Sequence, residues 1–212
     1  HGLGDHFRGS DLKTSANDDA VELDNELRIG STEFSADGKR LLNVGRYAFT
    51  GTLPGFELFD GVTFKLISRH VIASPGYLVS AGFAEGQRVW LVRVEWAKGN
   101  ATSKLILETL SSETGKNLST VSLSSNSGAI RPIRSVIVSE DLRWVALEHP
   151  GPMGEPMLDL LDAQTGMIQL RRTSSFTVPI QFLAGSDRLV TRQMNRDGLA
   201  IVDGAHEQPL AV

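Results

Sequence analysis

Metal coordination is the first chemistry that the residue types in this sequence suggest. Asn195 and Asp197 alternate ahead of a glycine, as oxygen ligands do at the start of a calcium loop, but no acidic residue stands at the position that completes such a loop. His1, Asp5 and His6 could bind a transition metal, yet the polar segment that carries them offers no fixed geometry. We therefore predict neither a bound metal nor a cofactor.

Catalytic groups are no easier to recognise. The sequence has no Gly-x-Ser-x-Gly nucleophile elbow and no glycine-rich loop for phosphate. The remaining histidines, His70, His149 and His206, show no spacing that suggests joint coordination. We predict no catalytic residue and favour a protein that is not an enzyme.

Residues suited to binding another protein are easier to identify. Segments 47–55 and 149–156 are rich in proline and glycine, are longer than a hairpin needs, and carry apolar side chains that we expect to be exposed. Rigid loops of this kind lose little entropy when they dock. Together with the shorter segment 194–198, they supply our predicted binding residues: Tyr47, Phe49, Leu53, His149, Met153, Asn195 and Arg196.

A repeated pattern indicates how these segments are positioned. An apolar residue, a polar turn and an arginine that leads into an apolar strand recur four times, with the arginine at Arg40, Arg88, Arg143 and Arg188. A second phrase, rich in Asp, Gly and Thr, follows each copy at a similar distance. Asp or Ser at a turn entry can bond its own backbone, and Gly accepts the positive φ of a tight turn. The spacing of roughly 40–50 residues is typical of β-propeller blades.

Two of these turns resemble those of a known repeat superfamily. The segments Ser35–Arg40 and Asp162–Gly166 are similar to the blade turns of WD40 and YVTN-type propellers, and the likeness covers about residues 27–212. No blade carries the Trp-Asp or Gly-His pairs of regular WD40 repeats, so the resemblance is to a divergent propeller, and no functional residue is carried over. The second turn also shares part of the pattern of quinoprotein dehydrogenase propellers, but the lysine and tryptophan expected after it are replaced by Met167 and Leu170.

We therefore predict an all-β fold, a propeller-type array of about four four-stranded antiparallel blades. The blades span about 27–70, 77–123, 131–172 and 178–212, and a polar lead-in of residues 1–26 is expected to be flexible. Each repeated arginine should begin the second strand of its blade, pack its stem and bond nearby carbonyls.

Closure of the array is the open question. Four complete blades leave no spare strand to latch the ends, so either the four close on themselves or the missing part comes from elsewhere. We favour an array that is part of a larger propeller, completed by another protein chain or by self-association. Its end faces would then be apolar, drawing on Leu27, Ile29, Leu41, Val44, Leu189, Val190, Leu199 and Ile201.

Composition excludes several classes of partner. The formal net charge of −4 gives no basic footprint for nucleic acid, and no apolar run approaches the ~18 residues that insertion into a membrane requires. The chain has no cysteine, so it forms no disulfide. No signal peptide or transmembrane segment is visible in this chain, and its localisation is left open.

Three functions remain open at this stage. The first is a non-catalytic binding or scaffold module within a larger protein or multiprotein assembly. The second is an enzyme, hydrolase or quinoprotein-like, with an incomplete site at the channel mouth, where Glu33 is the one acid that we can place on an inner strand. The third is a structural spacer in an envelope complex. A cofactor in the channel would favour the enzyme; a large apolar contact with another chain would favour the other two.

Overall fold

The computed structural model describes residues 29–45, 55–72, 76–95, 104–123, 133–173, 177–183, 186, 188–193, 198–203 and 206–209. These residues form sixteen β-strands and no helix. The strands make four separate four-stranded sheets, and every pair of neighbouring strands within them is antiparallel. The predicted all-β array of four four-stranded blades is confirmed. The lead-in 1–26 lies outside the described residues.

Each blade is a meander in which consecutive strands lie side by side. Blade 1 contains β1 (Ile29–Phe34), β2 (Arg40–Gly45), β3 (Gly55–Asp60) and β4 (Leu66–Val71). Blade 2 contains β5 (Gly76–Ala84), β6 (Arg88–Glu95), β7 (Lys104–Ser111) and β8 (Asn117–Leu123). Blade 3 contains β9 (Ser135–Val138), β10 (Trp144–Pro150), β11 (Pro156–Asp162) and β12 (Ile168–Thr173). Blade 4 contains β13 (Thr177–Phe182), β14 (Leu189–Gln193), β15 (Gly198–Asp203) and β16 (His206–Pro209).

The first repeated phrase builds the turn between the first and second strands of a blade. The Ser35 hydroxyl accepts a hydrogen bond from the backbone N–H of Arg40 at 2.9 Å and donates one to Asp37 at 2.8 Å. In blade 3 the Ser139 hydroxyl accepts from the backbone N–H of Trp144 at 2.9 Å. One serine side chain therefore closes the same five-residue connection in both blades.

The second phrase builds the turn between the third and fourth strands. The Asp60 carboxylate accepts a hydrogen bond from the backbone N–H of Thr63 at 2.8 Å, and Asp162 accepts from that of Thr165 at 2.8 Å. These carboxylates accept from backbone N–H groups that have no backbone partner within the turn. The predicted role of these aspartates is confirmed.

The four repeated arginines lie within one residue of their predicted places. Arg40 and Arg88 begin β2 and β6, whereas Arg143 and Arg188 stand one residue before β10 and β14. In blade 3, the pairing of the second and third strands places Trp144 at the position that Arg40 and Arg88 occupy in blades 1 and 2. Arg40 donates to the carbonyl oxygen of a neighbouring blade's turn at 3.0 Å and Arg88 to a carbonyl of its own turn at 2.7 Å, as predicted for these two.

Side chains alternate between the two faces of each blade. In blade 2, Val89 and Leu91 pack against blade 1, whereas Trp90 and Val92 pack against blade 3. We call the face that meets the preceding blade the backward face and the face that meets the following blade the forward face. Each internal interface of the described chain is therefore a forward face packed on a backward face.

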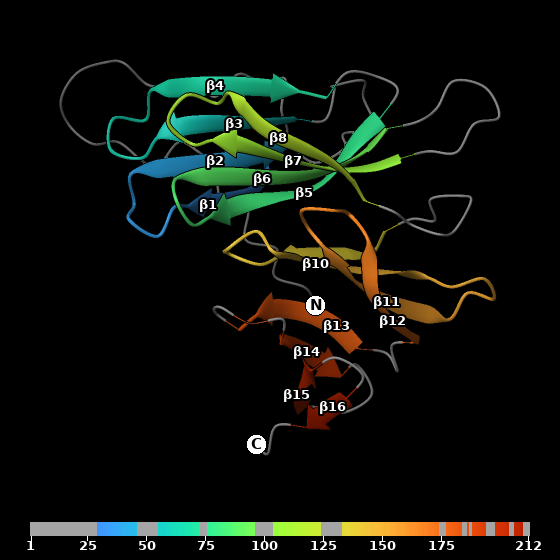
Figure 1. Cartoon of the computed structure of the whole chain (residues 1–212). Helices are drawn as coiled ribbons and strands as arrows, with labels where there is room; N and C mark the ends of the chain where they lie inside the picture. Colours follow the sequence, from blue (N-terminus) through green and yellow to red (C-terminus); the bar gives the residue numbers. More distant parts are fainter. Residues whose placement is uncertain are drawn as a thin grey trace, which may run out of the picture.

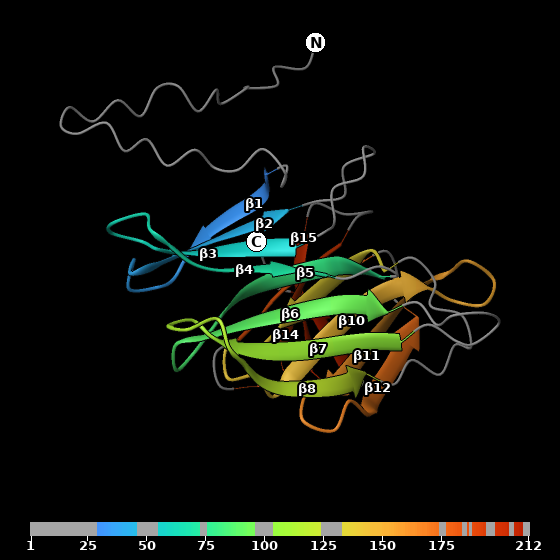
Figure 2. The ribbon, with the colours of Figure 1, turned by 90° about the horizontal axis from the view of Figure 1, so that it is seen from above.

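The core consists of three apolar clusters, one at each junction between consecutive blades in the described residues. None of these clusters joins blade 4 to blade 1. Figure 1 shows the blades following one another from β1–β4 at the top to β13–β16 at the bottom. Figure 2 shows the four strands of blade 2 side by side, from β5 to β8. In the part of the chain that the structure describes, blades 1 and 4 are therefore the two ends of the array.

Two of the residues predicted for the end faces lie elsewhere. Val44 packs in the cluster between blades 1 and 2, and Leu189 packs in the cluster between blades 3 and 4. Each stands on the opposite side of its strand from the end face, because successive side chains alternate across the sheet. The expectation for these two was therefore wrong.

Candidate functional site

The predicted binding residues fall into two groups. Those outside the described residues are Tyr47, Phe49, Leu53, Asn195 and Arg196. The described ones, His149 and Met153, belong to the end of β10 and to the loop that follows it.

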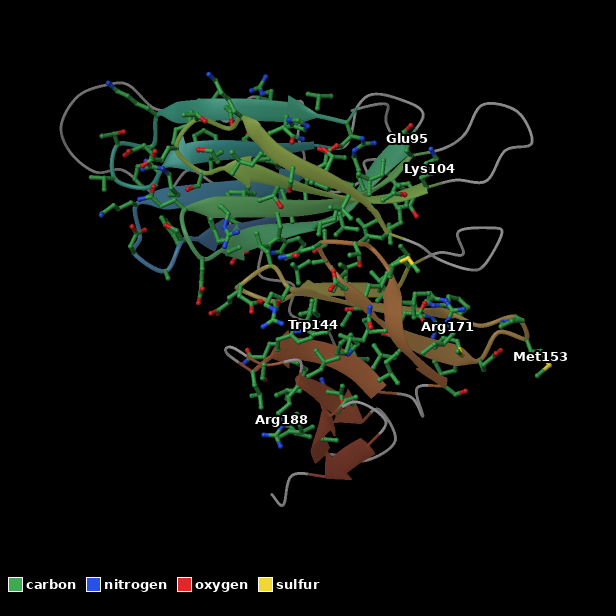
Figure 3. All side chains as sticks on the ribbon, viewed as in Figure 1. Glu95, Lys104, Trp144, Met153, Arg171 and Arg188 are labelled. Atoms are coloured by element: carbon green, nitrogen blue, oxygen red, sulfur yellow. The ribbon has the colours of Figure 1, made fainter. Side chains whose placement is uncertain are left out.

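Met153 stands at the tip of the loop between β10 and β11. Its side chain is 93% exposed and points away from the blade, at the end opposite Trp144 (Figure 3). The loop is held by internal bonds: the Glu155 carboxylate accepts from the backbone N–H of Met153 at 2.8 Å, and Gly151 accepts from Gly154 at 3.0 Å. An apolar, polarisable side chain on a braced loop is well suited to contact another protein.

His149 is buried, at 8% exposure. Its Nε2 lies 3.0 Å from the Asp159 carboxylate, and its Nδ1 lies 3.1 Å from the carbonyl oxygen of Pro150. Both neighbours are acceptors, so the doubly protonated ring satisfies both. The hydrogen bond to Asp159 raises the pKa of His149 above its ordinary value, despite the opposing effect of burial. The ring is thus held inside blade 3 and braces the base of the loop that carries Met153.

Asp159 is the centre of this group and is fully buried. Arg171 of β12, labelled in Figure 3, donates to both carboxylate oxygens at 2.7 and 2.6 Å. Burial alone would raise the pKa of Asp159, but the hydrogen bonds from Arg171 and His149 outweigh it and hold that pKa below its ordinary value. The carboxylate is therefore ionised and paired on two sides.

The same arrangement recurs in blades 1 and 2. Glu57 and Glu108 are buried, and each stands three residues before the turn residue of its third strand, as Asp159 does. Arg69 lies 2.7 Å from Glu57, and Arg93 lies 2.9 Å from Glu108. A buried carboxylate paired with an arginine is thus a feature of three blades. The sequence analysis missed it, although the constant spacing from the turn residue was a usable signal.

Each of these carboxylates forms an ion pair within its blade. Each has a fixed cationic partner, so it is not available as a base without the loss of that pair. Across the described ranges, no group of three or more His, Cys, Asp or Glu side chains is placed to hold a metal ion.

Glu33 lines a groove at the turns of the first two blades. The groove has a volume of about 400 Å³ and is bordered by the turns before β2 and β6, with Glu140 from the turn before β10. Burial raises the pKa of Glu33, although a backbone hydrogen bond from Phe83 acts in the opposite direction. The Glu33 carboxyl accepts the hydrogen bond from the backbone of Phe83, so it also joins blade 1 to blade 2.

The backward face of blade 1 carries a row of apolar side chains that crosses the sheet. Phe34 pairs with Leu41, Leu41 pairs with Phe59, and Phe59 pairs with Leu66. Phe59 is buried at the centre of the row, Leu41 is half-buried, and Phe34 at its edge is 53% exposed. No apolar cluster of the described residues connects this face to another blade.

The forward face of blade 4 is the other end of the array. Val190 pairs with Ile201 across β14 and β15, and both are half-buried. Leu199 is 39% exposed beside them, and it pairs with the exposed Arg192. The centre of this face is therefore apolar, and Arg192 places a positive charge beside it.

Among the described residues, no helix has the length and hydrophobicity that would let it cross a membrane.

Comparison with known proteins supports the fold alone. No protein-family model matches the sequence, and no curated protein matches it either. Solved structures do match. Hydrazine synthase from Kuenenia stuttgartiensis is 10% identical, with a TM-score of 0.58, over 82% of this chain and 58% of that one. The β-propeller domain of the trilobed protease from Pyrococcus furiosus, described as having an open velcro topology, is 12% identical, with a TM-score of 0.54, over 87% of this chain and 57% of that one.

A third match is acylaminoacyl peptidase from Pyrococcus horikoshii, which is 11% identical, with a TM-score of 0.57, over 88% of this chain and 32% of that one. The chain therefore spans less than two thirds of the length of each of these proteins. The four radial antiparallel sheets and these matches lead to one conclusion: the described chain is a four-bladed β-propeller array.

Proposed function

We propose that the chain is a non-catalytic binding or scaffold module that acts within a larger propeller or multiprotein assembly. The fold alone is compatible with catalysis, since hydrazine synthase is among the matching structures. The proposal rests instead on how this chain uses its own residues. Three of its buried carboxylates are paired with arginines, and exposed apolar side chains occur on both end blades, as at Phe34 and Leu199, and at the loop tip that carries Met153.

The observation that carries the proposal is the state of the two end faces. Positions that are buried inside each internal interface are apolar again on the backward face of blade 1 and the forward face of blade 4, where no described blade covers them. On these faces, about 100 Å² of apolar surface left in water would cost about 2.5 kcal/mol. Another protein chain or a second copy would remove this cost by completing the propeller.

The loops after the second strands form the proposed binding surface for a further protein. Its residues are Tyr47, Phe49, Leu53, His149, Met153, Asn195 and Arg196. In this surface Met153 is the exposed contact, and His149 acts from beneath by fixing the loop through Asp159.

Site-specific photo-crosslinking tests this function. A photoreactive amino acid is placed at Met153 and, as a control, at Leu118, which is exposed on the outer strand β8. In cells that make the protein, we expect a discrete protein adduct from position 153 and none from position 118. Equal labelling at both positions, or none at either, would overturn the proposed binding surface.

A further inference from the structure

The turns around the groove that Glu33 lines are tied to one another by backbone hydrogen bonds. The N–H of Glu85 donates to the carbonyl oxygen of Glu140 at 2.9 Å, which joins blade 2 to blade 3. The side chain of Arg40 donates to the carbonyl oxygen of Ser112 at 3.0 Å, which joins blade 1 to blade 2. The N–H of Ser112 in turn donates to the carbonyl oxygen of Gln87 at 2.8 Å. All five residues line the groove, so its frame is held across three blades.

The apolar part of the groove comes from the ends of the first strands of blades 1 and 2. Phe34 and Phe83 hold matching positions, because Phe34 pairs with Leu41 and Phe83 pairs with Val89, each one residue beyond the repeated arginine. Phe83 packs against the cluster between the two blades, whereas Phe34 is 53% exposed. Both line the groove. An exposed aromatic ring beside a hollow offers apolar contact area and a face that attracts cations.

The charged groups that line the groove are not matched in number. Among the described residues there are two cations and four acids: Lys39, Arg40, Glu33, Asp37, Glu85 and Glu140. Lys39 lies 3.6 Å from Asp37, and Arg40 lies 3.5 Å from Asp60, which does not line the groove. Within the described part of the chain, the three glutamates take part in no ion pair.

The glutamates are also placed close together by the fold. Glu85 and Glu140 stand at the same position of adjacent turns, two residues after the matching ends of their first strands, and both are exposed. Burial raises the pKa of Glu33, which shows that its carboxyl has lost part of its hydration. Carboxylates that share one hollow repel each other, so a cation that enters it is favoured.

The shape and the polar groups of the groove favour a guanidinium over an ammonium. A guanidinium is planar, stacks on aromatic rings and has five donors that can reach several acceptors at once. Besides the carboxylates, Ser112 lines the groove and is 2% exposed. Its backbone N–H and carbonyl are engaged in the bonds between turns, so the hydroxyl is the polar group that it can offer to an occupant.

We propose that this groove binds an arginine side chain of a partner protein, carried in an apolar segment that covers Phe34. Charge complementarity selects the occupant, since the guanidinium supplies the cation that Glu85 and Glu140 lack. The site is distinct from the proposed binding surface. Figure 3 shows Met153 and Trp144 at opposite ends of blade 3, and the turn that carries Glu140 leads into the strand that begins at Trp144.

NMR titration of the isotope-labelled chain with the capped tripeptide Leu-Arg-Leu tests the proposal. We expect saturable shifts of the backbone amides of the turns that carry Glu85 and Glu140. The same peptide with citrulline in place of arginine keeps the shape and loses the charge, so its Kd should be more than about tenfold higher. Equal affinity for the two peptides would overturn the proposal, as would the absence of saturable shifts up to about 10 mM peptide.

Variants of the groove test its residues one by one. Glu85→Gln/Glu140→Gln changes two exposed side chains, so the fold should remain and the Kd of the arginine peptide should rise more than about tenfold. Phe34→Ala should raise this Kd about two- to fivefold. Glu113→Gln is the matched control, because Glu113 is exposed on a different turn and does not line the groove. A double variant that binds as tightly as this control would refute the assignment.

The loop surface and the groove are told apart by exchanging the variants. Met153→Asp should leave the Kd of the arginine peptide unchanged, and Glu85→Gln/Glu140→Gln should leave the adduct formed from position 153 unchanged. If Met153→Asp abolished peptide binding, the peptide would be bound by the loop and the groove would be excluded as its site.

Discussion

Replacing Arg171 by methionine would leave the buried carboxylate of Asp159 with His149 as its remaining side-chain partner. The arginine supplies two charge-assisted hydrogen bonds to a carboxylate that is fully buried. Removing one member of a buried ion pair typically costs about 3–5 kcal/mol. The Arg171 side chain is 32% exposed, so solvent already screens part of the pair and we reduce the expected loss to about 2–3 kcal/mol.

The reasoning makes a sharper statement about the double variant. Converting Asp159 to leucine in the same chain removes the stranded charge along with its lost partner. Because an uncompensated buried charge costs more than a missing pair, Asp159→Leu/Arg171→Met should be more stable than Arg171→Met alone. A control is Arg134→Met: the Arg134 side chain is more than half exposed and lies 4.0 Å from Glu148, so its loss should cost at most about 1 kcal/mol.

Urea unfolding followed by tryptophan fluorescence measures these differences. The chain has three tryptophans, and Trp90 and Trp144 lie in described blades. For a chain of this size, a loss of 2–3 kcal/mol lowers the Tm by roughly 4–12 °C. A loss below about 1 kcal/mol for Arg171→Met, or a double variant less stable than the single one, would refute the view that Asp159 is a charge held by its partners.

Three further changes test other parts of the structure. Hydrogen bonding to Asp159 raises the pKa of His149 in the folded state. The stabilisation of the fold by protonated His149 is therefore complete below the unfolded pKa near 6.5 and is lost as pH rises through the higher folded pKa. The unfolding free energy should fall over that range in the wild type and stay flatter in His149→Gln. Phe64 has a φ of 55°, where two other blades have glycine, so Phe64→Gly should raise the unfolding free energy by about 0.5–1 kcal/mol, and an unchanged urea midpoint would contradict this strain. Gly38→Ala and Gly166→Ala share a φ near 70°, but only at Gly166 would the new methyl meet a neighbouring blade's backbone; Gly38→Ala should therefore cost about 1 kcal/mol and Gly166→Ala clearly more, and equal thermal shifts would argue against that contact.

The sequence predicts the turns well because they are local. Ser35 and Asp162 bond backbone groups within a few residues, so the phrase itself contains both partners. The arginine that marks the repeat is a weaker guide. In blade 3 the Ser139 hydroxyl bonds the backbone five residues later, at Trp144, where the strand begins. Arg143 therefore stands one residue before the strand.

The buried ion pairs depend on contacts that no local pattern reveals. Arg69 and Arg171 come from the fourth strands of their blades, whereas Arg93 comes from a second strand. The partner of each acid is therefore known only once the strands are paired in register. The same holds for His149, whose loop context suggested a binding residue, while its burial follows from the position of Asp159 on the adjacent strand.

Cysteine labelling tests the central claim, that the end faces are interfaces, most directly. The chain has no cysteine, so a single thiol at Leu41 or Leu199 reports on one end face without background. With the purified chain at micromolar concentration, the thiols of Leu41→Cys and Leu199→Cys should react more slowly than that of the exposed control Leu118→Cys, and dilution should remove the protection. Thiols at both end faces that react as fast as the control at every concentration, in a chain that remains folded, would contradict the account.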